Sequence, residues 1–248
     1  MSVKCGIVGL PNVGKSTLFN ALTKSGIAAE NYPFCTIEPN IGIVEVPDAR
    51  MQALADIVKP QRMQYATTEF VDIAGLVAGA SKGEGLGNQF LATIRETDGI
   101  VNVVRCFEDD NVVHVAGKVD PISDIATIVT ELALADLTTV EKAQERNVKL
   151  VRSGDKDAAK LGELLVQVAA CLNEGKPART LTLDLAQRAL LKPLCLLTMK
   201  PVMYVANVAE KGFANNPLLT RVEEYAAHEG EPVVAICAAL ESEIAVLS

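Results

Sequence analysis

The residues with the clearest chemical meaning lie near the start of the chain, where positions 9–16 are GLPNVGKS. This octet fits the phosphate-binding pattern G-x-x-x-x-G-K-[ST] without a mismatch. Glycines let such a loop bring its backbone N–H groups close to phosphate oxygens. The ammonium group of Lys15 is expected to reach the β- and γ-phosphates, and the hydroxyl of Ser16 is expected to bind Mg²⁺. The residues predicted to contact the nucleotide phosphates are Asn12, Val13, Gly14, Lys15, Ser16 and Thr17.

A chance match is the alternative, and it arises in roughly 1% of chains of this length at ordinary glycine frequencies. The context argues against chance, because the octet follows an apolar stretch typical of a buried strand and opens a helical pattern. A helix that begins at Ser16 also directs its N-terminal dipole at the phosphates. The motif therefore predicts a nucleoside-triphosphate site after the first strand.

Further residues have types and positions that suit the metal ion and the γ-phosphate. Asp72 opens the sequence DIAG at the end of an apolar run, and its carboxylate is expected to hold Mg²⁺ through water. The backbone N–H of Gly75 is expected to bond the γ-phosphate. Thr36 lies after the first predicted helix, where a threonine ligates Mg²⁺ when a triphosphate is bound; an ordinary loop threonine is the alternative. The predicted metal ligands are Ser16, Thr36 and Asp72, and the predicted catalytic residues here are Lys15 and Gly75.

Short apolar runs alternate with helical patterns along the chain, which predicts an α/β fold with a mainly parallel, doubly wound sheet. Most runs are rich in Val and Ile without alternation, as expected for strands covered on both faces. Strands are predicted at residues 4–10, 41–46, 67–72, 100–107, 201–205 and 232–237. Helices are predicted at residues 16–25, 49–58, 87–97 and 219–229. With the phosphate loop after the first strand, this order indicates a Ras-like P-loop G domain.

The stretch 123–197 departs from this alternation. Apolar residues at helical spacing predict two long helices separated by a turn near Gly154, the second ending near Gly175. Two long helices joined by a short turn favour an antiparallel α-helical hairpin. Because the hairpin lies between two strands of the sheet, we predict that residues 1–122 and 198–248 form the G domain and that 123–197 is an insertion.

Composition narrows the classes of protein to which the chain can belong. About half of its 248 residues are apolar, and no run approaches the ~20 apolar residues that a membrane-spanning helix needs, so no membrane partner is expected. Taken alone, the formal net charge of -8 argues against a protein that coats nucleic acid such as DNA, although it does not exclude a local basic face. The six cysteines form no CxxC pair and only two histidines accompany them, so a structural zinc site is not expected. Free thiols without an export signal are typical of the cytoplasm.

Three segments together resemble the Obg family of P-loop G-domain proteins. Residues 75–90 contain a glycine-rich second switch like that of the family, and residues 207–210 are NVAE where most G proteins have NKxD. Residues 237–241, CAALE, match the fifth nucleotide-binding motif. The NxxE variant together with a helical hairpin is similar to the Obg-like ATPase branch. The resemblance covers essentially the whole chain.

The resemblance also has a limit at the end of the chain. Members of that branch run about a hundred residues further and end in a small TGS domain, which we expect to be absent here. Only residues 242–248 follow the fifth motif, so the helix that closes a Ras-like core is expected to be at best begun.

The last two motifs imply the residues that hold the nucleotide base. They are Asn207, Val208, Glu210, Cys237, Ala238 and Ala239. In NKxD proteins the aspartate accepts two hydrogen bonds from guanine, whereas adenine offers neither donor on that edge. Glu210 is one methylene longer than aspartate and Val208 replaces the lysine, while Asn207 can still bond a purine. We expect ATP to be preferred over GTP; the alternative is a GTPase in which Glu210 is a surface acid.

Mg²⁺-dependent hydrolysis of ATP to ADP and phosphate is the reaction that these residues favour. One alternative is a binding switch that senses ATP with negligible turnover. A purely structural helical scaffold would not need the phosphate loop and the metal ligands together. Leu76 stands where Ras-like enzymes carry the glutamine that orients the attacking water. Because leucine cannot hydrogen-bond water, slow basal turnover is expected.

A histidine from the segment after the fourth strand is implied by the resemblance as the catalytic group in place of that glutamine. His114 fits, because ligands of open α/β sheets bind beyond the carboxyl ends of the strands. An imidazole can accept a hydrogen bond from water near neutral pH. The alternative is a loop histidine that caps backbone groups. His228 is a poorer candidate, since it ends a predicted surface helix.

A cytoplasmic, translation-associated factor that binds ribosomes is also implied by the resemblance. The first long helix of the insertion carries basic residues at spacings that place them on one face. These residues are Lys142, Arg146, Lys149 and Arg152. Such a stripe can contact ribosomal RNA phosphates. The alternative is a solvated face balanced by Glu141 and Glu145.

Overall fold

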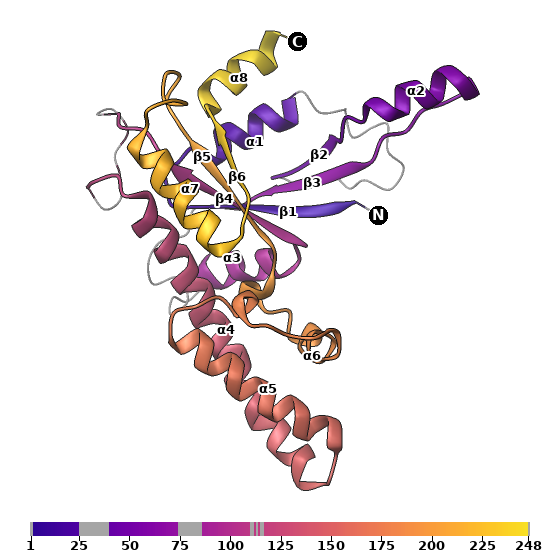
Figure 1. The fold of residues 1–248 in the computed structure, drawn as a ribbon, viewed down its shortest axis with the longest axis vertical. Coiled ribbons are helices and arrows are strands. Elements are labelled where there is room, and N and C mark those ends of the chain that lie inside the picture. Colours follow the sequence, from indigo (N-terminus) through magenta and orange to yellow (C-terminus); the bar gives the residue numbers. More distant parts are fainter. Residues whose placement is uncertain are drawn as a thin grey trace.

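The computed structural model describes residues 2–24, 40–73, 86–109, 112, 114 and 117–247, and the strands in this part of the chain form one six-stranded sheet (Figure 1). The strands are β1 (Val3–Val8), β2 (Ile41–Glu45), β3 (Thr67–Asp72), β4 (Gly99–Arg105), β5 (Val202–Asn207) and β6 (Val233–Ile236). Their order across the sheet is β2-β3-β1-β4-β5-β6. All neighbours are parallel except β2 and β3. The predicted α/β fold with a mainly parallel sheet is confirmed.

The strand order reverses beside β1, because β3 pairs with one edge of β1 and β4 pairs with the other. In this register Ile7 lies opposite Asp72, and Val8 lies opposite Asn102. Ligands of open α/β sheets bind outside the carboxyl ends of the strands at such a switch point. The loop after β1 is therefore placed where a ligand is expected.

Helices cover both faces of the sheet. They are α1 (Lys15–Lys24), α2 (Ala49–Val58), α3 (Leu86–Arg95), α4 (Pro121–Arg152), α5 (Lys156–Asn173), α6 (Leu185–Leu191), α7 (Pro217–Glu229) and α8 (Ala238–Leu247), with 3₁₀ turns η2 (Ala178–Thr180), η3 (Lys192–Leu194) and η4 (Leu197–Met199). α1 packs against α8 on one side of the sheet, and α4 packs against α7 on the other (Figure 1). The predicted strands and the helices predicted outside the insertion agree with these bounds to within two residues at each end.

The closing helix α8 corrects one expectation. It begins inside the fifth motif, where the backbone N–H of Glu241 donates to the carbonyl of Cys237 at 3.0 Å, and it runs to Leu247. It packs along α1, as Figure 1 shows. The expectation that this helix is at best begun was wrong, because the motif residues themselves form its first turn.

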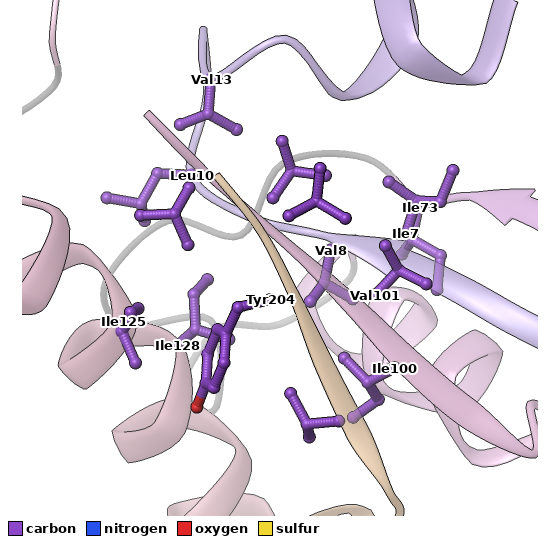
Figure 2. Close-up of a cluster of buried hydrophobic side chains, with 14 of the residues drawn as sticks. Ile7, Val8, Leu10, Val13, Ile73, Ile100, Val101, Ile125, Ile128 and Tyr204 are labelled. Atoms are coloured by element: carbon purple, nitrogen blue, oxygen red, sulfur yellow. The ribbon is translucent and has the colours of Figure 1, made fainter. Parts of the chain in front are cut away.

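The main apolar core packs the sheet against α1, α3, α4 and α7. Figure 2 shows Ile125 and Ile128 on α4 beside Tyr204 of β5, with Leu10 and Val13 of the loop after β1 nearby. The exposed fraction of these five residues ranges from 0% to 7%. Burial of one such side chain contributes about 1.5–3 kcal/mol. The buried side chains of Leu10 and Val13 therefore anchor the phosphate loop to the apolar core.

Beyond the sheet, α4 continues and α5 returns beside it, which gives the predicted helical hairpin (Figure 1). A second apolar cluster fills the space among α4, α5, α6 and the 3₁₀ turns. The predicted boundary at residue 123 falls inside α4, whose first half packs on the sheet and whose second half packs on α5. α4 is thus shared by both clusters, and the domain boundaries stay a prediction. None of the helices in the described ranges is long and apolar enough to cross a membrane.

Candidate functional site

The segments predicted to bind nucleotide meet at one edge of the sheet. Residues 9–17 follow β1, Asp72 ends β3, residues 207–210 begin at the end of β5, and residues 237–239 follow β6. All four strands are parallel to one another, so their carboxyl ends share this edge. Segments far apart in the sequence are therefore neighbours in space.

The loop after β1 has the backbone shape of an anion-binding loop. Asn12 has φ 63° and Gly14 has φ 99°, two left-handed conformations within three residues. Alternation of right- and left-handed residues points successive N–H groups into one concavity. A Cβ atom on Gly14 would also overlap the side-chain nitrogen of Asn207. Glycine is required at position 14 for both reasons.

The side chain of Lys15 folds back onto the backbone of the phosphate loop. Its Nζ donates a hydrogen bond to the carbonyl of Leu10 at 2.7 Å, and the residue is buried. Burial lowers the pKa of the ammonium group from 10.5 to about 8, and the nearby carboxylate of Asp72 opposes this shift. A phosphate oxygen placed in the loop would give this cation an anionic partner, which is the role predicted for it.

Ser16 and Asp72 lie side by side as a pair of oxygen ligands. The Ser16 hydroxyl donates to Oδ2 of Asp72 at 2.8 Å. The other carboxylate oxygen, Oδ1, is buried and has no hydrogen-bond partner among the described residues. A buried carboxylate oxygen is costly unless a donor or a cation satisfies it. Mg²⁺ prefers one or two such oxygens together with phosphate oxygens, so the residues present fit the ion.

Asn207 connects the phosphate loop with the fifth motif. Its Nδ2 donates to the carbonyl of Val13 at 2.9 Å, and its Oδ1 accepts from the N–H of Ala238 at 3.0 Å. A side-chain amide has a second N–H and a second lone pair, so bonding to a purine stays compatible with these contacts. Val208 is buried, whereas Glu210 is exposed in the turn after β5.

The other base and phosphate positions are also located. Cys237 and Ala238 are buried, and Ala239, Thr17 and Asn12 are exposed at the same edge of the sheet. The contacts of the residues at this edge with a nucleotide stay predictions.

His114 lies in the segment between β4 and α4, and it is buried. Its Nε2 is 3.0 Å from Oδ2 of Asp124, which lies in the first turn of α4. The side chains of His114 and Asp124 are 4% and 7% exposed. His228, in contrast, is exposed in the last turn of α7. The imidazole of His114 thus contacts a carboxylate of the long helix.

Several predicted residues fall outside the described residues. They are the metal ligand Thr36, the γ-phosphate contact Gly75 and Leu76, which occupies the glutamine position. Most of the glycine-rich segment 75–90 also lies outside, with α3 beginning at Leu86. These assignments stay predictions.

Two residues around His114 were not found by sequence reasoning. Arg105, at the end of β4, is 1% exposed and donates to the backbone carbonyls of Phe107, Asp109 and Val112 at 3.1, 3.2 and 2.9 Å. Its guanidinium carbon also lies 4.6 Å from the centre of the Phe107 ring. The available signal was a cation inside an apolar run, which usually marks a buried polar network. Asp124 gave no comparable signal, because an acidic residue in a first helical turn is common.

Comparison with known proteins agrees with this geometry. Residues 4–141 match the protein family described as 50S ribosome-binding GTPase. The Ribosome-binding ATPase YchF of Haemophilus influenzae is 62% identical over 247 residues, a match that covers 100% of this chain and 68% of that protein. The protein of the same name from Bacillus subtilis is 54% identical over 250 residues, with the same coverage.

One solved structure supports the likeness at the level of the whole chain. The structure of the Schizosaccharomyces pombe YchF GTPase has a TM-score of 0.85 at 37% sequence identity. That match covers 100% of this chain and 68% of the other. The fold and the sequence therefore lead to the same group of relatives.

Proposed function

Because the chain belongs to the YchF family of P-loop proteins, we propose that it is a Mg²⁺-dependent ATPase that hydrolyses ATP to ADP and phosphate. The observation that carries the proposal is the pairing of Ser16 with Asp72 beside the buried Lys15. A hydroxyl, a carboxylate with an unsatisfied oxygen and a cation are what a Mg²⁺–triphosphate complex requires of its site. The curated relatives carry the name Ribosome-binding ATPase, which supports the choice of substrate.

In the proposed mechanism the protein positions charge and performs no covalent chemistry. The N–H groups of the phosphate loop and the ammonium group of Lys15 would bind the β- and γ-phosphates, and Ser16, Thr36 and Asp72 would hold the metal ion. Bound Mg²⁺ would neutralise charge on the β- and γ-oxygens. The N–H of Gly75 would bond the γ-phosphate. These contacts stabilise the charge of the transition state.

The residues expected to contact the base favour ATP over GTP, because the lysine and the aspartate that bind guanine in NKxD proteins are both replaced. Position 208 holds a buried valine in place of the lysine that packs along guanine. The side chain of Glu210 is one methylene longer than the aspartate that accepts two hydrogen bonds from guanine, so its carboxylate does not reach the same position. Asn207 retains the amide that can face a purine. Replacement of the aspartate by Glu210 lowers the affinity for guanine without adding a contact to adenine, so the preference for ATP over GTP is expected to be modest.

A GTPase is the second candidate, and it has an observation of its own. The solved yeast relative is described as a GTPase, and the matching family is described as a GTPase family. The two candidates share the phosphate and metal chemistry and differ at residues 207–210. An ATP-sensing switch with negligible turnover is a third possibility, distinguished by the rate alone.

Turnover without a partner is proposed to be slow, well below the range of ~1–100 per second of ordinary kinases. Leu76 cannot orient water, so the role of orienting it is assigned to His114. Its imidazole contacts Asp124, and the carbonyl of Val112 two residues earlier accepts from Arg105 at the end of β4.

The experiment that tests the proposal is steady-state ATP hydrolysis with Mg²⁺ and with a chelator present. Hydrolysis should require Mg²⁺, Lys15→Ala should abolish both binding and turnover, and Asp72→Asn should raise the Mg²⁺ concentration needed. Lys160→Ala removes an exposed lysine of α5 and is the control, expected to be unchanged. Mg²⁺-independent hydrolysis, or normal binding by Lys15→Ala, would refute the proposed site.

The partner is proposed to be the ribosome, in the cytoplasm. The curated relatives are named for ribosome binding. The basic residues of α4, Lys142, Arg146, Lys149 and Arg152, are all exposed. Among the ion pairs of the described residues, none joins them to Glu141 or Glu145. A basic stripe without paired acids suits contact with RNA phosphates better than a balanced, solvated face does.

A further inference from the structure

We propose that Asp124 is the positioning residue for His114: its carboxylate accepts a hydrogen bond from Nε2–H and so fixes the imidazole tautomer that leaves the lone pair on Nδ1. The proposal rests on the catalytic role proposed above for His114. Which ring nitrogen carries the proton is set by the hydrogen bond that the ring makes. The tautomer can be measured without measuring turnover, so the two proposals can fail separately.

The contact is short and shielded from water. Nε2 of His114 is 3.0 Å from Oδ2 of Asp124, within hydrogen-bond distance. Both residues are buried, at 8% and 5% exposed. In such surroundings a hydrogen bond is electrostatically stronger than at the surface, and an unmade one is more costly. The two groups are therefore held together firmly enough to choose one tautomer.

The buried carboxylate of Asp124 requires a hydrogen-bond donor. Burial raises the pKa of its carboxyl, the contact with His114 is the largest opposing influence, Asp120 raises it further and Arg105 lowers it. A buried carboxylate without a donor is strongly disfavoured. The imidazole can supply that donor through Nε2, which is the ring nitrogen that faces Asp124.

Capping of α4 does not account for Asp124. The N-cap is Asp120, whose carboxylate accepts from the N–H of Ser123, and Pro121 occupies the first turn. Asp120 also pairs with Arg221 at 2.9 Å on the surface. Since the cap is already provided, the side chain of Asp124 is available for the histidine.

The carboxylate is mounted on a rigid support. Ile125 and Ile128, which follow it on α4, are 0% and 2% exposed and pack against Tyr204 in the core (Figure 2). Sites on packed helices hold their geometry better than sites on loops. Any displacement of the first turn of α4 would have to disturb the main core.

The segment that carries His114 is fastened at its other end by Arg105. This buried guanidinium binds three carbonyls of the segment, those of Phe107, Asp109 and Val112. His114 is two residues beyond the last of these carbonyls. The segment is thus attached to β4 through Arg105 and to α4 through Asp124, and both of these residues are buried.

The hydrogen bond to Asp124 determines which nitrogen of His114 acts as the hydrogen-bond acceptor. With Nε2–H donated to the carboxylate, Nδ1 carries the lone pair that can accept a hydrogen bond from a water O–H. An asparagine in place of Asp124 can instead offer its own N–H to Nε2 and stabilise the opposite tautomer. Asp124→Asn therefore changes the proton position with little change in shape.

Nitrogen NMR of the imidazoles is the direct test. The chain has two histidines, so protein labelled with ¹⁵N-histidine gives signals from His114 and His228 alone, and His114→Ala assigns them. At alkaline pH, where imidazoles are neutral, we expect His114 of the unmodified protein to have a protonated Nε2 and an unprotonated Nδ1. In Asp124→Asn the opposite tautomer or a mixture should appear. Asp120→Asn is the matched control and should leave the His114 signals unchanged.

The unmodified protein alone can overturn the proposal, whatever the stability of the variants. A protonated Nδ1 on His114 would show that Asp124 does not select the tautomer. An unchanged tautomer in a folded Asp124→Asn protein would show the same.

A double-mutant cycle connects the tautomer to the reaction. Asp124→Asn should lower kcat about 10- to 100-fold and leave the affinity for ATP within about twofold. Asp124→Glu, which keeps a carboxylate, should recover part of that loss. In a His114→Ala background Asp124→Asn should have no further effect, because the group that it positions is gone.

The outcomes separate the two proposals. Normal turnover in His114→Ala would remove the catalytic role of the histidine, while the NMR result would still decide the tautomer. A slow His114→Ala combined with a normal Asp124→Asn would overturn the positioning role alone. An undiminished effect of Asp124→Asn in the His114→Ala background would show that Asp124 acts through another group.

Discussion

At the scale of single residues, the site is organised by polar groups that are bonded to one another and to the backbone around them. Lys15 donates to a carbonyl of its own loop, the Ser16 hydroxyl bonds Asp72, and the side chain of Asn207 bonds two backbone groups. Each group is thus held near the geometry that a phosphate, a metal ion or a base would require. Such preorganisation lowers the entropy that must be lost on binding.

A substitution at His114 separates catalysis from binding. His114→Ala should lower turnover about a hundredfold or more, since a group that orients water acts in the transition state. The affinity for ATP, measured by titration of a labelled analogue, should be nearly intact. His228→Ala is the control, because that ring is exposed on α7 and should have no effect. An equal loss of rate and affinity would instead assign His114 to binding or folding.

The residues of the site differ in how far the sequence could predict them. Lys15 and Ser16 were predicted because a phosphate loop has fixed spacing, and Asp72 because it ends an apolar strand. Asp124 could not be predicted as the partner of His114, since the two residues are ten positions apart and no pattern specifies their contact. The two hydrogen bonds of the Asn207 side chain, to Val13 and Ala238, could not be predicted either, because they depend on the positions of β1, β5 and β6 in the sheet.

At the scale of elements, α4 serves both parts of the molecule. Its first half packs on the sheet and its second half on α5. The chain that returns from α6 to β5 is tied to the middle of α4 by Asp136, which is fully buried. The carboxylate accepts from the N–H groups of Leu197 and Thr198 at 2.8 and 2.7 Å, and from the Thr198 hydroxyl at 2.7 Å.

Removal of that carboxylate should destabilise the fold. In Asp136→Asn an amide N–H faces donors that the carboxylate accepted, so at least one buried donor is left unsatisfied. The free energy of unfolding should fall by about 1–3 kcal/mol. Chemical denaturation measures the change, and Asp157→Asn, an exposed first-turn residue of α5, is the comparison, with an expected change below about 0.5 kcal/mol. Equal stability of the two variants would contradict the structural role of Asp136.

Element types could be predicted better than their connections. Apolar runs and helical periodicity indicated the strands and the four helices predicted outside the insertion to within two residues, because burial and periodicity act locally. The tie between Asp136 and Thr198 spans 62 positions and follows only from the path of the chain around α4. The expectation for α8 was wrong because only the residues after the fifth motif were counted toward the helix, whereas Ala238 is already its first residue.

At the scale of the whole molecule, the nucleotide edge and the helical hairpin lie apart and are joined by α4 (Figure 1). Asp124 stands near one end of this helix, and the basic residues Lys142, Arg146 and Lys149 lie on its distal half. A partner that binds the distal half therefore contacts the same helix that holds His114.

Charge reversal on that half should weaken ribosome binding. Lys142→Glu with Arg146→Glu should lower co-sedimentation with ribosomes and reduce the salt dependence of binding by a slope of about 2, one unit for each lost phosphate contact. Lys59→Glu with Arg62→Glu, a matched pair of exposed cations just after α2, should have little effect. Similar losses from the two pairs would indicate attraction through net charge and no specific surface.

The identity of the base tests the central claim, that this site serves ATP, most directly. The measurement is displacement of a labelled, non-hydrolysable ATP analogue by unlabelled ATP and by GTP in the presence of Mg²⁺. The buried Val208 and the exposed Glu210 leave guanine without its usual partners, so ATP should displace the label at the lower concentration. The difference should be modest, about tenfold or about 1.4 kcal/mol. Tighter binding of GTP than of ATP would contradict the account and make the protein a GTPase.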